Sequence, residues 1–560
     1  MKSVWLMATL FVAGPALAQE EQCVEEERLE NARLLRRMSL DLRNRVPTVE
    51  EMAAARDGIS DETIDAFLNS EGFLEVMRAH HQDLLWPNLD AVEVIPNTQL
   101  LVPYETADGP LWYAPIRAVF NRTTGNAANI YTPCLNEPAR FDEDGRIILQ
   151  PITDDGGNVV AYAEGWIEVT PYWDPTTTVR VCALDAQPDA TGTACPGPPE
   201  RYPFSEPSCR GAAAYDQFVT EPFRGSQVEC GGALNILAPE CGCGPNLRHC
   251  VPLRPDIDVF ERIRGALLEQ QMRVVDRVVR EGLPYEEVLA STTLEWNGPL
   301  VHYMQWIAGT SDQLYAGELD GWNLPDKAWS DASWTPTEGS LRSAGVLTSP
   351  GYLLRFAANR MRAHRYYNAF ECRSFVPNGP LPSPFEACSQ REDLSERCGC
   401  DSCHVTLEPL AAHWGRFIEN GFGELRSDEF PPLFGGVCQV PIDGVDTLSL
   451  CLRAYNLNTQ PGTEVAEYAN LLNALVFRDT SEAVIVESGP GLRVEQGVNA
   501  SIIQSCLAER MWTEFMGRLP TAEESLELLP QLVQRFEGEG RSLKAMVRAI
   551  VELPRYGDVQ

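Results

Sequence analysis

The stretch Arg45-Val46-Pro47-Thr48-Val49-Glu50-Glu51 contains a strong signal for the start of a helix. Thr48 is a typical N-cap residue, and Glu51 three positions later completes a capping box, in which each side chain bonds the other residue's backbone N–H. Before this stretch, apolar residues recur at spacings of three and four, at Leu34, Leu35, Met38 and Leu42. The sequence therefore predicts helices over residues 24–89.

The same signal returns near the end of the chain. Arg518-Leu519-Pro520-Thr521-Ala522-Glu523-Glu524 aligns with the first stretch without a gap, and Arg510-Met511 aligns with Arg37-Met38 at the same offset. A weaker echo, Gly282-Leu283-Pro284-Tyr285-Glu286-Glu287, lies between the two copies. Pro-Thr-x-x-Glu is a common helix start, but two arginines kept in register favour a duplicated helical hairpin.

A different pattern occupies residues 95–255. Alternating apolar runs predict strands at 147–149, 166–169 and 178–181, with turn signals at Asp144-Gly145 and Asp155-Gly156-Gly157. The paired carboxylates Asp154-Asp155 are explained by turn chemistry rather than catalysis. Eight cysteines lie in this region, and residues 186–255 are rich in Pro, Gly and Cys. We expect an inserted β-rich domain held by disulfides.

Helical patterns return on either side of a second loop-rich region. They cover 256–290, the surroundings of 346–367, and 462–560, where only 484–486 suggests a short strand. We therefore expect a mainly α multidomain protein with an inserted β-rich, disulfide-containing domain and a small cytochrome-c-like haem segment. Its expected parts are a signal peptide (1–18), an N-terminal helical domain (24–94), the β-rich Cys-rich insertion (95–255), a central helical domain (256–371), the haem segment (372–455) and a C-terminal helical domain (456–560).

The N-terminus predicts export. Lys2, an apolar run over residues 4–12 and Ala16-Leu17-Ala18 form the three regions of a signal peptide, with cleavage expected after Ala18. No later apolar stretch reaches the roughly 18 residues that a membrane helix needs. The 17 cysteines fit an oxidising compartment. We expect a soluble protein of the periplasm or cell envelope of a Gram-negative bacterium, or of the extracellular space.

The composition also bears on partners. The formal net charge is −35, from 80 acidic and 45 basic residues. Such a field repels nucleic acid and anionic membranes and favours partners with basic surfaces. The same charge also serves solubility alone.

Cys400-Asp401-Ser402-Cys403-His404 is the motif that carries chemistry. Two thiols three residues apart, followed directly by a histidine, are the attachment signature of a c-type haem. Cys400 and Cys403 would hold one covalent haem c, and His404 would be the proximal iron ligand. The alternative is a pair of structural thiols beside an unrelated histidine. Cys398 supports that alternative, because it is a competing thiol two residues away.

Several residues are candidates for the sixth iron ligand. His413 is the first choice, since Trp414 and Phe417 beside it could wall the same pocket. The other candidates are Met361, His364, Met511 and Met516. Without a sixth ligand, the site could bind a small molecule.

A second cluster, Cys241-Gly242-Cys243-Gly244-Pro245-Asn246-Leu247-Arg248-His249-Cys250, has three thiols and an imidazole. In an oxidising compartment disulfides are favoured over a zinc or iron site there. No nucleophile elbow, phosphate loop or His-Glu-x-x-His zinc helix is present.

Several segments resemble the planctomycete-type cytochrome c proteins with their associated helical domains of unknown function. Residues 36–48 look like the opening of their N-terminal helical domain, Gly345-Val346-Leu347-Thr348-Ser349-Pro350 like the segment before their haem motif, and 506–551 like their C-terminal domain. Residues 400–404 with Leu407-Glu408-Pro409-Leu410 look like the haem motif and its acidic-Pro sequel. Gly415, six residues after Pro409, stands where those proteins usually have a glutamate. The resemblance implies haem and architecture, and leaves 95–255 unaccounted for.

We therefore expect single-electron transfer to a redox partner protein, with an electron carrier favoured over an enzyme. One alternative is a cell-envelope binding or scaffold protein that acts through the β-rich insertion, with haem absent or only structural. A second alternative is a peroxidase-like or small-ligand-binding haem site.

Overall fold

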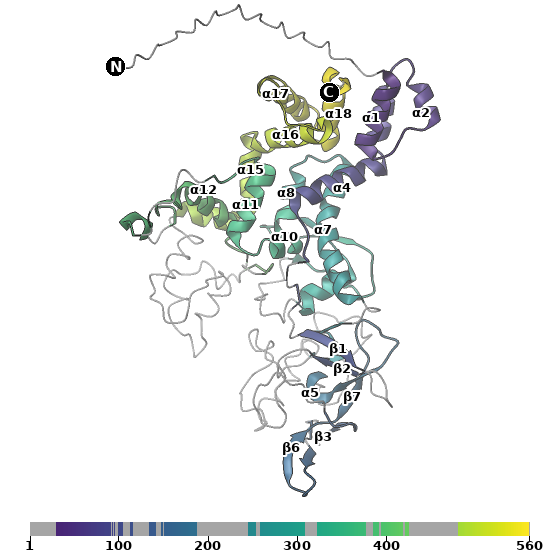
Figure 1. Ribbon diagram of the computed structural model, residues 1–560, viewed down its shortest axis with the longest axis vertical. Coiled ribbons are helices and arrows are strands. Elements are labelled where there is room, and N and C mark those ends of the chain that lie inside the picture. Colours follow the sequence, from purple (N-terminus) through teal and green to yellow (C-terminus); the bar gives the residue numbers. More distant parts are fainter. Residues whose placement is uncertain are drawn as a thin grey trace, which may run out of the picture.

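The computed structural model describes residues 30–90, 92, 94–95, 99–104, 112–115, 134–141, 147–148, 150–186, 243, 245–253, 258–307, 322–376, 383, 385–390, 394–417, 421–424 and 480–558. Helices predominate in these residues, and a small mixed sheet lies at one end of the molecule (Figure 1). The expectation of a mainly α chain with a β-rich, disulfide-containing part is therefore confirmed. The predicted signal peptide lies outside the described residues. No described helix is long and apolar enough to cross a bilayer.

The first predicted helices form with the expected capping. They are α1 (Asn31–Arg43), α2 (Val49–Ala54), α3 (Asp61–Leu68) and α4 (Glu71–Leu85). The backbone N–H of Glu51 donates to Thr48 Oγ1 at 3.1 Å, and the Thr48 N–H donates to Glu51 Oε2 at 2.7 Å. The reciprocal bonds satisfy backbone donors that a helix start leaves free, which explains why α2 begins after Thr48.

The second copy forms in the same way. The C-terminal helices are α15 (Thr480–Asn499), α16 (Ile502–Met516), α17 (Ala522–Gly538) and α18 (Leu543–Val551). Thr521 Oγ1 accepts the Glu524 N–H at 3.2 Å, and Glu524 Oε2 accepts the Thr521 N–H at 2.8 Å. The middle echo differs, because α8 (Glu287–Ala290) has no side-chain cap.

The first and the last helices that the structure describes pack against each other (Figure 1). The Tyr556 hydroxyl donates to Asp41 Oδ2 at 2.7 Å, and Lys544 Nζ donates to Asn69 Oδ1 at 2.8 Å. Apolar side chains of α1, α3, α4, α16 and α18 belong to one core. The N-terminal and C-terminal helices therefore lie side by side, although more than 470 residues separate the bonded pairs.

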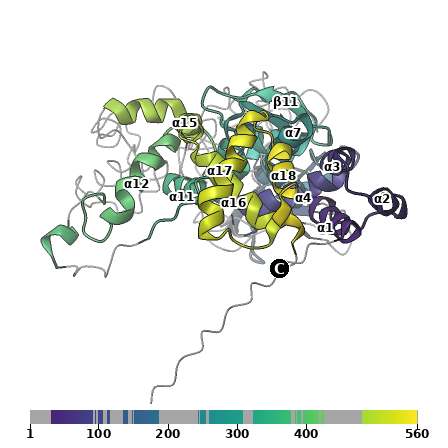
Figure 2. The ribbon, with the colours of Figure 1, turned by 90° about the horizontal axis from the view of Figure 1, so that it is seen from above.

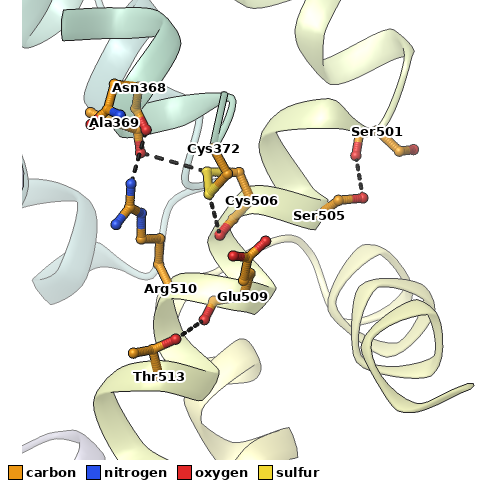
Figure 3. Close-up of a disulfide and its surroundings, with 9 residues drawn as sticks. All are labelled: Asn368, Ala369, Cys372, Ser501, Ser505, Cys506, Glu509, Arg510 and Thr513. Atoms are coloured by element: carbon orange, nitrogen blue, oxygen red, sulfur yellow. Dashed lines mark hydrogen bonds between the residues drawn. A yellow bond between two sulfur atoms is a disulfide. The ribbon is translucent and has the colours of Figure 1, made fainter. Parts of the chain in front are cut away.

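A disulfide ties the C-terminal helices to the central ones. Cys372, just after α11 (Asn359–Phe370), is bonded to Cys506 on α16, with 5.2 Å between their Cα atoms. Figure 3 shows the Arg510 guanidinium beside this bond, donating to the Asn368 carbonyl at 2.9 Å. The sequence did not indicate this pairing.

The β-rich part contains the predicted strands. A five-stranded mixed sheet has the order β7-β8-β2-β1-β9. Its strands are β1 (Leu100–Tyr104), β2 (Trp112–Pro115), β7 (Trp166–Val169), β8 (Val179–Cys182) and β9 (Val251–Pro252). Two short antiparallel pairs join β3 (Arg140–Phe141) to β4 (Ile147–Ile148) and β5 (Gln150–Thr153) to β6 (Val159–Ala163). A disulfide links Cys134 to Cys182.

The turn between β5 and β6 confirms the interpretation of its carboxylates. Asp154 Oδ1 accepts the Gly156 N–H at 2.9 Å and the Asn158 N–H at 2.8 Å. This is local turn chemistry at an exposed loop. The other turn signal, Asp144-Gly145, lies outside the described residues.

The central helices carry the core that joins the parts. They include α7 (Val259–Glu281), α9 (Gly298–His302) and α10 (Pro350–Arg355), with β10 (Thr293–Trp296) paired to β11 (Thr335–Glu338). Tyr172, after β7, stacks on His302 with 3.9 Å between ring centroids. Leu101 and Val181 of the sheet belong to the same apolar cluster as α7. The sheet and the helices therefore share one core.

The segment that precedes the haem-like motif is held by a close backbone contact. Gly345 has φ +48°, and a Cβ there would lie 2.1 Å from the Val288 carbonyl oxygen. Both the left-handed backbone and the contact demand glycine.

One predicted strand is wrong. Residues 484–486 lie in α15, which contains a kink at Gly489 with φ +70°. Val486 is fully buried against the short helix η10 (Ala412–Trp414). Packing of this face overrides the β-propensity of three branched residues.

Candidate functional site

The predicted attachment residues lie at the start of one helix. α12 (Asp401–Ala411) begins directly after Cys400, its N-cap residue. The backbone N–H groups of Cys403 and His404 donate to the Cys400 carbonyl at 3.1 and 2.9 Å. Because residues three and four positions apart lie on one face of a helix, the turn brings both thiols and the imidazole to the same side. Figure 2 shows α12 at the side of the molecule, beyond α11.

Cys400 and Cys403 are free thiols, and both are partly exposed. Cys398 does not compete with Cys400 and Cys403, because it is bonded to Cys388. Among the cysteines of the described residues, only these two are not in disulfides. Cys400 and Cys403 are therefore not bonded to each other or to Cys398 in this structure.

His404 is held by a carboxylate one turn further along α12. Its Nδ1 bonds Glu408 Oε1, and a carboxylate oxygen accepts such a bond. The imidazole proton is therefore placed on Nδ1, which leaves the lone pair of Nε2 for a metal. Arg360 of α11 donates from Nε to the same Glu408 oxygen at 2.8 Å. The helical spacing of four could have indicated the His404–Glu408 pair, but nothing in the sequence pointed to Arg360.

His413 lies in η10, directly after α12, and is buried. Its Nδ1 faces the Gly489 carbonyl oxygen at 3.0 Å, so Nδ1–H donates and Nε2 keeps its lone pair. Burial lowers the pKa of His413 to about 4, with the Gly489 hydrogen bond acting in the opposite direction. The neutral ring that a metal ligand requires is therefore the form present at neutral pH. Trp414 and Phe417 beside it are also buried.

The other candidates for the sixth iron ligand lie on two different helices. Met361 and His364 lie on α11, which packs against α12, and Met361 is 46% exposed. Met511 and Met516 lie on α16, buried in the core of the terminal hairpins. The structure therefore brings the α11 residues to the neighbourhood of α12 and uses the α16 residues as packing.

The second cysteine cluster holds a disulfide. Cys243 is bonded to Cys250, and the ring of His249 is buried beside it. Cys241 lies outside the described residues. The expected preference for a disulfide is thus confirmed for the two thiols that the structure describes.

A polar pocket of about 350 Å³ lies between α4, α11 and α16, and sequence reasoning missed it. His80 lines it, and its Nδ1 lies 3.0 Å from Glu514 Oε2. Arg365 lines it too, with its guanidinium 3.9 Å from the centre of the Trp86 ring. Burial lowers the pKa of Arg365 to about 10. In the part of the chain that the structure describes, no group of three or more His, Cys, Asp or Glu side chains could hold a metal ion.

No protein-family model matches this chain, and neither a curated protein nor a solved structure matches it. The function must therefore be argued from the residues of the site.

Proposed function

We propose that this chain is an exported c-type haem protein that passes single electrons in the periplasm or cell envelope. The observation that carries the proposal is the pair of free thiols at the start of α12. Cys400 and Cys403 are free, whereas the other described cysteines are in disulfides, and His404 follows them with Nε2 available. This is the donor set that attachment of one haem requires.

The residues present fit that group. Cys400 and Cys403 would hold it by thioether bonds, and His404 would ligate the iron through Nε2. The haem would supply a one-electron Fe(III)/Fe(II) couple. The chain would set the ligands, the burial and the hydrogen bonds around it, which are the quantities that fix the potential of a protein-bound haem.

The surroundings of the site suit transfer to a partner protein. Cys400 and Cys403 are partly exposed, and Val405 between them and Glu408 is 60% exposed. An electron carrier needs its centre near the surface, within reach of its partner. The net charge of −35 favours a partner with a basic surface. Export is supported by the disulfides and by the signal-peptide pattern of the sequence.

The test is expression together with the cytochrome c maturation machinery, followed by a reduced pyridine haemochrome spectrum and an intact mass. We expect a c-type spectrum and the mass of one added haem. Cys400→Ala with Cys403→Ala should abolish both. Cys388→Ala with Cys398→Ala is the matched control, because it removes two neighbouring cysteines but should retain the haem. A wild-type protein without haem would refute the proposal and direct attention to the β-rich insertion.

His413 is the proposed sixth ligand. Its fixed Nδ1–H and neutral ring favour ligation through Nε2. His413→Ala should convert a low-spin absorption spectrum into a high-spin one, and His364→Ala, on α11, should not. A high-spin wild-type spectrum would instead indicate an open site and favour small-ligand binding.

A further inference from the structure

Glu408 is a buried carboxylate placed between two positively polarised groups. Its side chain is 1% exposed. Oε1 accepts hydrogen bonds from Nδ1 of His404 and from Nε of Arg360, the latter at 2.8 Å. Oε2 is buried without a hydrogen-bond partner among the described residues. The charge of Glu408 is thus concentrated on contacts with these two side chains.

Such a carboxylate is costly to bury unless it is paired. Arg360 supplies the pairing charge from a different helix, α11, and its own side chain is 22% exposed. His404 supplies the second donor from one turn earlier in α12. The arrangement therefore links the orientation of the imidazole to the packing of α11 against α12.

We propose that Glu408 is a positioning residue that fixes the His404 ring and lowers the reduction potential of the haem iron, and that Arg360 moderates this effect. The inference rests on the proposed function. A carboxylate that accepts a hydrogen bond from Nδ1–H raises the basicity of Nε2, and a more basic ligand stabilises Fe(III) relative to Fe(II). The positive charge of Arg360 partly compensates the negative charge on the same oxygen, so it weakens the influence of Glu408 on Nε2.

Because Glu408 and Arg360 act on the iron in opposite directions, replacing each should shift the reduction potential in opposite directions. Glu408→Gln keeps an acceptor of similar size but removes the charge. We expect it to shift the Fe(III)/Fe(II) equilibrium toward Fe(II) by about tenfold, which is about 59 mV for a one-electron couple. Arg360→Gln leaves the carboxylate uncompensated, so we expect a shift toward Fe(III). The measurement is a spectroelectrochemical titration of the holoprotein.

The matched control is Glu524→Gln. Glu524 is also a buried carboxylate paired to an arginine, Arg518, but it belongs to the C-terminal hairpin. Its replacement should leave the potential unchanged. A general effect of losing a buried charge would move the potential in both glutamine variants, and this would contradict a specific role for Glu408.

The outcomes separate the two proposals. A wild-type protein without a haemochrome spectrum refutes the haem itself. Haem that is retained, with potentials that stay unchanged or move in the same direction in both variants, overturns the inference alone. If Glu408→Gln does not retain haem, Arg360→Gln decides: a lowered potential supports the role of Glu408, and an unchanged one overturns it.

Discussion

Removing the Cys372–Cys506 disulfide should strongly destabilise the helical part of the protein. The bond closes a loop of 134 residues and joins α11 to α16. In the chain-entropy model, a loop of that length contributes about 5 kcal/mol at 25 °C, because the bond restricts the unfolded chain. The Cys388–Cys398 bond spans only 10 residues. The same relation gives about 2.7 kcal/mol for it.

The assay compares Cys372→Ala/Cys506→Ala with Cys388→Ala/Cys398→Ala. Hydrogen exchange of the most protected amides in α11 and α16 reports the free energy of opening of this region. We expect the first variant to lose roughly three to four orders of magnitude of protection, since about 1.4 kcal/mol corresponds to a factor of ten. A loss no larger than that of the second variant would refute the argument from loop length.

Three further predictions concern the same thiols and the C-terminal hairpin. Cys388→Ser alone should lower the yield of haem attachment in a haemochrome assay, because the freed Cys398 can pair with Cys400; Cys388→Ser with Cys398→Ser should restore the yield, and equal yields would argue against competition. Bonds from arginines, chiefly Arg518, lower the pKa of Glu524 from 4.5 to about 2. The resulting stability is complete above pH 4.5 and is lost as the pH falls through 2. Thermal unfolding should therefore show Glu524→Gln less stable than wild type at pH 7, with a difference that shrinks as the pH falls through 2, whereas a constant difference would contradict this. Thr521→Ala should cost about 1 kcal/mol of unfolding free energy in urea titrations through loss of the cap; Thr521→Ser should cost much less, and equal losses would exclude capping as the cause.

Local features of this protein could be read from its sequence. The Thr48 and Thr521 capping boxes could be predicted because each bond in them joins two residues that are three positions apart. Alternation with period two predicted strands at 166–169 and 178–181, and they form at 166–169 and 179–182. The spacing of Cys400, Cys403 and His404 could be read in the same way, but the helix that carries them, α12, forms in a region that the sequence predicted to be loop-rich. The caps depend on bonds between near neighbours, and the strands were found from the alternation of their side chains; one segment contains either signal by itself.

Tertiary structure decided which distant groups meet. The sequence could not show that Cys398 pairs with Cys388, that Cys372 pairs with Cys506, or that Arg360 reaches Glu408. Residues 484–486 were predicted as a strand, but their burial against η10 stabilises helix α15 instead. These outcomes depend on contacts between residues that are 10 to 134 positions apart in the chain. The sequence by itself determined most local elements and the thiol–imidazole motif. Contacts across the fold decided which thiols stay free and which arginine pairs with Glu408, the carboxylate bonded to His404.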